Sequence, residues 1–86
     1  MDERKILEDT LKVAKLELKS ALGPRAIRTF LFRYQLARLI LAEVGSPIQQ
    51  AEEVKVLIQQ LAARSFGAQV PRSGSKRIDE VVEQVT

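Results

Sequence analysis

PRAIRTFLFRYQLARLILAEV, residues 24–44, carries apolar side chains on two sides of one predicted helix. At 3.6 residues per turn, a first apolar line falls on one face at spacings of three and four. Its members are Ile27, Phe30, Tyr34, Ala37, Leu41 and Val44. A second line, on nearly the opposite side, consists of Phe32, Leu36, Leu39 and Ile40. Because a helix that is apolar on two sides is normally covered on two sides, we expect residues 24–44 to be the central helix of a bundle, which a second chain can share.

Two more helices of about 20 residues are expected to flank this one. Residues 2–22 have an apolar stripe that includes Leu7, Leu11 and Leu18, and Gly23 suits the left-handed conformation that ends a helix. Pro24 suits the first turn of the next helix. After Gly45, Ser46 and Gln49 have the spacing of a capping box, which predicts a third helix over residues 47–66, ended by Gly67. We therefore predict an all-α fold with three antiparallel helices in a core of residues 1–67.

The remainder of the chain is expected to be a linker and a short docking helix. Residues 68–75 are small and polar with one proline, which is typical of a linker. In residues 76–86, apolar side chains recur at helical spacing, at Ile78, Val81, Val82 and Val85. Such a short, β-branched helix is weak in isolation, so we expect it to be ordered only where it docks.

The composition is that of a folded domain whose core is aliphatic. The 86 residues are 45% hydrophobic and 29% charged, and only 5% are aromatic. We expect the core to contain Leu11, Leu18, Phe30, Tyr34, Leu41, Ile58 and Leu61.

Several classes of function are disfavoured by what the chain lacks. There is no cysteine and no histidine, which excludes disulfides, thiolate chemistry and the usual zinc ligands, and removes the commonest general base at neutral pH. Glu52 and Glu53 are adjacent, so on a helix their carboxylates point in different directions and cannot share a proton. We expect no cofactor, no metal and no enzyme activity. An enzyme that uses Arg, Glu and Gln between helices is the most distant alternative.

Charged residues along the most apolar segment argue against a membrane partner. They occur through residues 24–44, at Arg25, Arg28, Arg33, Arg38 and Glu43. The polar N-terminal sequence MDERKILED is unlike a signal peptide. We therefore expect a cytoplasmic protein.

Two groups of basic residues are candidates for anion binding. Arg25 and Arg28 lie in the first turns of a predicted helix, where free backbone N–H groups favour an anion. Arg72, Lys76 and Arg77 lie among Ser and Gly near the linker. The net charge of +3 permits an anionic partner without requiring one. The alternative, which we expect, is that these residues are only solvated edges of packed helices.

The sequence favours a small, non-enzymatic interaction module that self-associates, docks on a protein partner, or does both. The alternative is a mildly basic accessory or regulatory protein that binds nucleic acid. The interface candidates are Phe32, Leu36, Leu39, Ile40, Ile78, Val81, Val82 and Val85. We expect a homodimer, with the C-terminal helix docking either in its own chain or across the dimer.

Overall fold

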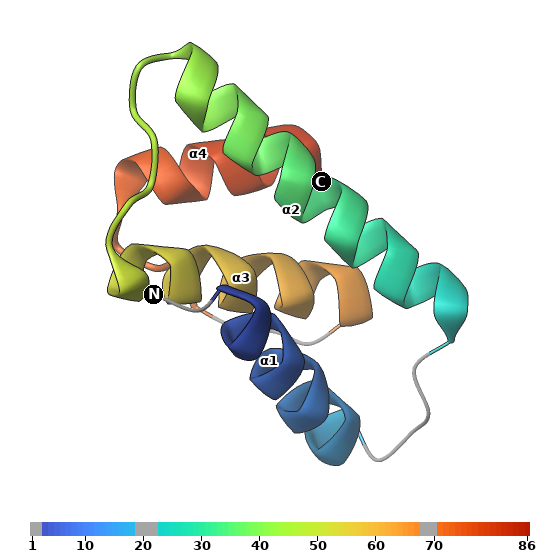
Figure 1. Cartoon of the computed structure of the whole chain (residues 1–86). Helices are drawn as coiled ribbons and strands as arrows, with labels where there is room; N and C mark the ends of the chain where they lie inside the picture. The colour runs from blue at the N-terminus through green and yellow to red at the C-terminus, as the bar shows by residue number, and fades with distance from the viewer. Residues whose placement is uncertain (1–2, 19–22, 68–70) are drawn as a thin grey trace.

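The computed structural model describes residues 3–18, 23–67 and 71–86, and these residues form four helices and no strand. The helices are α1 (Glu3–Leu18), α2 (Pro24–Glu43), α3 (Ala51–Phe66) and α4 (Lys76–Val85) (Figure 1). The prediction of an all-α fold is confirmed for this part of the chain. Helix α3 has 16 residues rather than about 20. The described part of α1 also has 16 residues, and the outer ends expected for the first helix lie outside the described residues.

The central helix of the molecule is α3, and not the helix of residues 24–44. Helix α3 packs against each of the other three helices, whereas α2 packs against α3 and α4. The reason lies in the side chains of α3, which are buried at neighbouring positions and therefore on more than one side. These buried residues are Val54, Leu57, Ile58, Leu61, Ala62 and Ala63.

Helix α2 contributes four residues of its first apolar line to the core, whereas Val44, the C-cap of α2, is 69% exposed and its expected place on the buried face is wrong. Phe30, Tyr34, Ala37 and Leu41 are buried, and the Phe30 ring contacts that of Phe66 with 5.6 Å between centroids. The expected burial of Phe30, Tyr34 and Leu41 is confirmed, as is that of Ile58 and Leu61 on α3. The largest fully buried side chains also include Ile48, Ile78 and Val82.

Helix α1 is less deeply embedded than the sequence predicts. Ile6, Leu7 and Leu11 pack against the core but stay partly exposed, so the expected heavy burial of Leu11 in the core is wrong. Among the described residues α1 packs on α3 alone, and one neighbour cannot cover the wide apolar surface of this helix. The side chain of Leu18 lies outside the described part.

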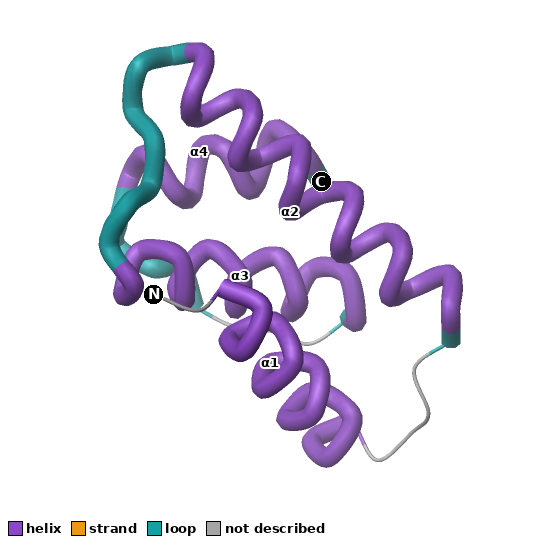
Figure 2. Tube along the Cα trace, viewed as in Figure 1, coloured by secondary structure: helices purple, strands orange, loops and turns teal. Residues whose placement is uncertain are grey.

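The connection between α2 and α3 differs most from the prediction. Helix α3 begins at Ala51, and residues 44–50 form the turn and loop between α2 and α3 (Figure 2). The predicted capping box is therefore wrong: the N-cap is Gln50, and Ser46 instead accepts a hydrogen bond from Arg77 at 2.9 Å. The physical reason is Ile48, which the loop places in the core at 2% exposure.

The predicted boundaries at Pro24 and Gly67 are confirmed, whereas Pro47, expected to be the first residue of the third helix, lies in the loop before α3. Pro24 is the first residue of α2, and Gly67 ends α3 with φ of 79°, where only glycine is free of strain. Gly23 has φ of −70° and is the N-cap of α2, so its expected left-handed conformation is wrong.

The start of α4 is fixed by a side-chain network. The N-cap is Ser75, and its backbone N–H donates to the Ser73 hydroxyl at 3.1 Å. That hydroxyl donates to Asp79 Oδ1 at 2.7 Å, and the Ser73 backbone N–H donates to the same oxygen at 3.1 Å. These bonds connect the segment that precedes α4 to the first turn of the helix.

Candidate interaction surface

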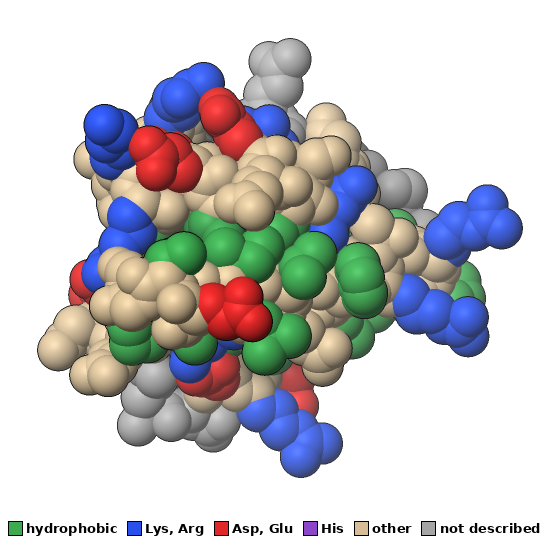
Figure 3. Space-filling model, turned by 90° about the horizontal axis from the view of Figure 1, so that it is seen from above, with side chains coloured by type: hydrophobic (Ala, Val, Ile, Leu, Met, Phe, Trp, Pro, Cys, Tyr) green, Lys and Arg blue, Asp and Glu red, His purple; other side chains and the backbone are tan. Residues whose placement is uncertain are grey.

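The outward side of α2 carries exposed apolar side chains. Phe32 and Leu39 are each 64% exposed, and Leu36 between them is half-buried. They stand opposite the buried line of α2 because successive residues on a helix are separated by about 100°. Figure 3 shows hydrophobic side chains gathered in the middle of the face seen from above, where α2 is the outer helix. We call Phe32, Leu36 and Leu39 the outer strip.

Charged residues lie at both ends of the outer strip. Arg25 and Arg28 are exposed on the first turns of α2, and Glu43 is exposed at its last residue. Within residues 3–18, 23–67 and 71–86, neither Arg28 nor Glu43 has an ion-pair partner. The outer strip therefore has a positive end and a negative end.

The C-terminal helix docks on its own chain in this structure. Ile78, Val81 and Val82 are buried in the core, and Val85 packs at its edge. Helix α4 lies against α2 and α3, and Ile40 packs against the same core. Five of the eight interface candidates are thus engaged within the chain. The three remaining candidates, Phe32, Leu36 and Leu39, are the residues of the outer strip.

The basic candidates do not come together as one site. Arg25 and Arg28 lie at the start of α2, whereas Lys76 and Arg77 lie at the start of α4, at the other end of the molecule (Figure 1). Two of the three side chains in the second group form ion pairs with acidic residues. Arg72 pairs with Glu83 at 2.7 Å, and Arg77 pairs with Glu53 at 2.5 Å.

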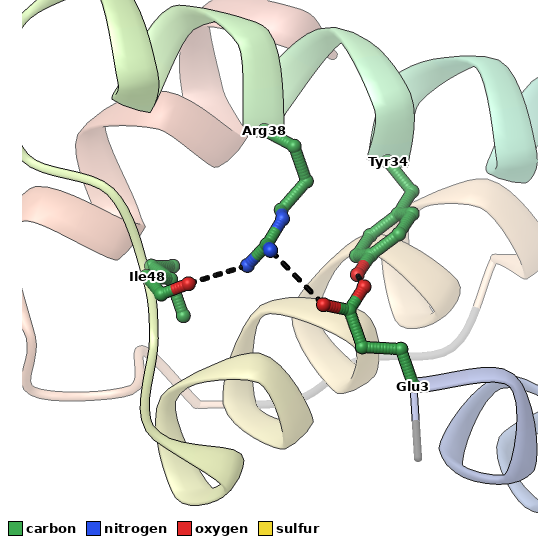
Figure 4. Close-up of polar contacts among 4 residues, drawn as sticks. All are labelled: Glu3, Tyr34, Arg38 and Ile48. Atoms are coloured by element: carbon green, nitrogen blue, oxygen red, sulfur yellow. Dashed lines mark hydrogen bonds and ion pairs between the residues drawn. The ribbon is translucent and has the colours of Figure 1, made fainter. Parts of the chain in front are cut away.

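A polar network joins α1, α2 and the loop before α3 (Figure 4). Arg38 donates to Glu3 Oε1 at 3.0 Å and to the Ile48 carbonyl at 2.7 Å, while the Tyr34 hydroxyl donates to Glu3 Oε2. Burial raises the pKa of the Tyr34 hydroxyl, and the Glu3 carboxylate raises it further. The network positions helices. It was not predicted, because Glu3 is more than thirty residues from both Tyr34 and Arg38 in the sequence.

A groove of about 700 Å³ lies between α1 and α3, beside the segment that precedes α4. Val13, Val56 and Phe66 supply apolar lining, and Asp9, Lys55 and Arg72 supply charges of both signs. No three Asp or Glu residues of the described chain gather into a possible metal site.

Comparisons with other proteins leave the surface as the main source of functional argument. None of the described helices is long and apolar enough to cross a membrane. No protein-family model, curated protein or solved structure matches this chain.

Proposed function

We propose that this protein is a non-enzymatic interaction module that self-associates through the outer strip of α2. The observation that carries the proposal is the 64% exposure of both Phe32 and Leu39, about two turns apart on one helix face. Monomeric proteins seldom leave a contiguous apolar patch in water, and such patches mark interaction sites. Burial of one large apolar side chain contributes about 1.5–3 kcal/mol, so a strip of this kind can contribute usefully to association.

The position of α4 supports a covering that comes from another chain. The four apolar residues of α4 are buried in the core or packed at its edge, so this helix has no further apolar face to lay over Phe32 and Leu39. A second copy of the chain brings a second outer strip. Two-fold association of identical surfaces is the commonest arrangement among soluble oligomers.

Nucleic-acid binding has less support. Arg72 and Arg77 already pair with Glu83 and Glu53, and acids beside phosphates would repel them. Arg25 and Arg28 are too few to supply the salt-dependent affinity that several phosphate contacts give. A gel shift with generic DNA and RNA at two salt concentrations tests this alternative, and we expect no binding.

Sedimentation equilibrium of the wild type and of a double variant, Phe32→Glu with Leu39→Glu, tests the proposal. At about 100 µM the wild type should have twice the monomer mass of 9.7 kDa, since this concentration lies well above a micromolar Kd. The double variant should sediment as a monomer with unchanged helix content by circular dichroism, because both positions are exposed. Leu16→Glu, at a 73% exposed position on α1, is the control and should remain dimeric. A monomeric wild type at 100 µM would overturn the proposal.

A further inference from the structure

The outer face of α2 has an internal symmetry in its sequence. Phe32 and Leu39 are equally distant from a point between Gln35 and Leu36, and Arg28 and Glu43 are equally distant from the same point. At about 100° per residue, these four residues fall within an arc of about 60° on the helix. Phe32 and Leu39 are equally exposed at 64%, and Arg28 and Glu43 are also exposed.

This symmetry matches the geometry of an antiparallel pair of helices. A two-fold axis through the point between Gln35 and Leu36 brings Phe32 of one copy to Leu39 of the other, and Leu39 to Phe32. The same operation brings Arg28 of each copy to Glu43 of the other. Phe32 and Leu39 then meet apolar residues, and Arg28 and Glu43 meet opposite charges, while Leu36 and Gln35 of both copies lie together beside the axis. The surface is therefore largely complementary to itself, as a two-fold interface requires.

We propose that two copies of this chain pair through antiparallel α2 helices in this register. The inference rests on the self-association proposed above and adds its orientation. Charge complementarity favours a second copy as the occupant of the outer strip, because one surface supplies both signs in the right places. Rim charges of this kind contribute mainly to partner choice and register, whereas the apolar residues between them contribute most of the affinity.

The parallel arrangement lacks this complementarity. It would place Arg28 beside Arg28 and Glu43 beside Glu43, and like charges side by side are destabilising. Arg28 and Glu43 are 15 positions apart, which is about 22 Å along a helix. Because this separation exceeds the Debye length of about 8 Å at physiological ionic strength, the charges at one end cannot offset the repulsion at the other.

Charge reversal tests the register through the dissociation constant. Arg28→Glu alone places two acids together at both ends of the pair, and Glu43→Arg alone places two bases together there. Each variant should therefore dimerise about tenfold more weakly than the wild type. An equimolar mixture of the two variants should regain affinity near that of the wild type, because every contact in the mixed dimer again joins opposite charges. Arg64→Glu, which changes the net charge equally at an exposed site on α3, should leave the dissociation constant within about twofold.

A second measurement reports orientation without altering these charges. The chain has no cysteine, so a single introduced cysteine can cross-link only to its counterpart in a second copy. Gln35→Cys lies beside the proposed axis and should form an intermolecular disulfide, which needs Cα atoms within about 7 Å. Leu31→Cys should not, because its two copies would be separated by about 13 Å along the antiparallel helices.

The outcomes separate the two proposals. If wild type is dimeric and Phe32→Glu with Leu39→Glu splits it, but neither charge reversal weakens it, self-association holds and the antiparallel register is wrong. Efficient cross-linking of Leu31→Cys would likewise overturn the antiparallel register. A wild type that is monomeric at about 100 µM would contradict both self-association and the antiparallel register.

Discussion

The Tyr34 hydroxyl donates a hydrogen bond to the Glu3 carboxylate, which joins the middle of α2 to the first turn of α1. The same carboxylate accepts a hydrogen bond from Arg38, whose other terminal nitrogen donates to the Ile48 carbonyl. One acid at the start of the described chain thus holds two side chains of α2, and one of them holds the loop before α3. Because α1 packs on α3 alone among the described helices, these polar contacts are what connects α1 to α2.

Glu3→Gln should lower the free energy of unfolding by about 1 kcal/mol. The amide keeps the shape of the side chain but removes the charge that pairs with Arg38, which is only 31% exposed. Urea denaturation followed by circular dichroism measures the change. The matched control is Glu8→Gln, whose ion pair with Arg4 is far more exposed, and this variant should lie within about 0.5 kcal/mol of the wild type. Equal losses in the two variants would contradict the structural role of Glu3.

Leu41→Ala should cost about 2–5 kcal/mol, because Leu41 is 3% exposed and truncation leaves a cavity in addition to the lost apolar transfer energy. Leu16→Ala makes the same chemical change at a 73% exposed position and should change stability little. The measurement is the urea midpoint of each variant. An unchanged midpoint for Leu41→Ala would mean that the buried line of α2 is misassigned.

Ile48→Ala should also cost about 2–5 kcal/mol, although Ile48 lies in a loop. The side chain is 2% exposed and belongs to the core formed by the helices. The neighbouring Gln49→Ala, at an exposed position of the same loop, should have little effect in the same urea titration. If the loop only connected the two helices, both substitutions would leave the urea midpoint nearly unchanged. That result would contradict the structural role of Ile48.

The buried faces of the helices were predicted well from the sequence. The conformation of the connections between helices was predicted less well. Apolar spacing correctly placed Phe30, Tyr34 and Leu41 in the core, because helical periodicity is a local property of the chain. Ser46 and Gln49 have the spacing of a helix start, but burial of Ile48 outweighs a cap that contributes about 1 kcal/mol. A tertiary contact of this kind leaves no local signal in the sequence.

The candidate surface was predicted only in part for a similar reason. Periodicity identified Phe32, Leu36 and Leu39 as a second line, and the structure leaves Phe32 and Leu39 exposed. Ile40 has the same apolar character but packs against the core, because its position on α2 is nearer the buried side. The apolar residues of α4 gave no indication of whether they would dock in the same chain. Whether α4 docks in its own chain depends on the three-dimensional course of the segment before it, which apolar periodicity does not indicate.

Stability should fall at acid pH in part because of Asp79. Its hydrogen bond with the Ser73 hydroxyl holds the pKa of this carboxyl below its usual range. A lowered folded pKa contributes stability that is present above the unfolded pKa of about 3.9 and is lost as the pH falls through the folded value. The free energy of unfolding should therefore decline below about pH 4, as urea midpoints across this range would show.

Asp79→Asn should make that acid decline shallower, because the folded and unfolded states of the variant no longer bind different numbers of protons at this position. Glu80→Gln is the matched control, since Glu80 is exposed and has no hydrogen-bond partner among the described residues. At neutral pH its free energy of unfolding should lie within about 0.5 kcal/mol of the wild type, because substitutions at exposed positions change stability little. If Asp79→Asn kept the full slope, the Ser73 network would not contribute to the pH dependence.

Tyr34 should titrate at a higher pH in the folded protein than in urea. Burial raises the pKa of its hydroxyl, and the hydrogen bond to Glu3 and the charge of that carboxylate add to the effect, while Arg38 partly opposes it. Tyr34 is the only tyrosine of the chain, so the near-ultraviolet absorbance of tyrosinate reports on this group alone. In urea the midpoint should lie near the ordinary value of about 10.

The raised pKa has a defined consequence for stability at alkaline pH. The stabilising contribution is fully present below the unfolded pKa of about 10 and is lost as the pH rises toward the folded value, because only the neutral hydroxyl fits the buried site and can donate to Glu3. Tyr34→Phe should therefore lose less stability than the wild type as the pH rises above about 10. Glu3→Gln should lower the midpoint of the folded protein without restoring it to the urea value, because burial is the larger cause and remains in place. A native midpoint equal to that in urea would show that Tyr34 is open to solvent and does not donate to Glu3.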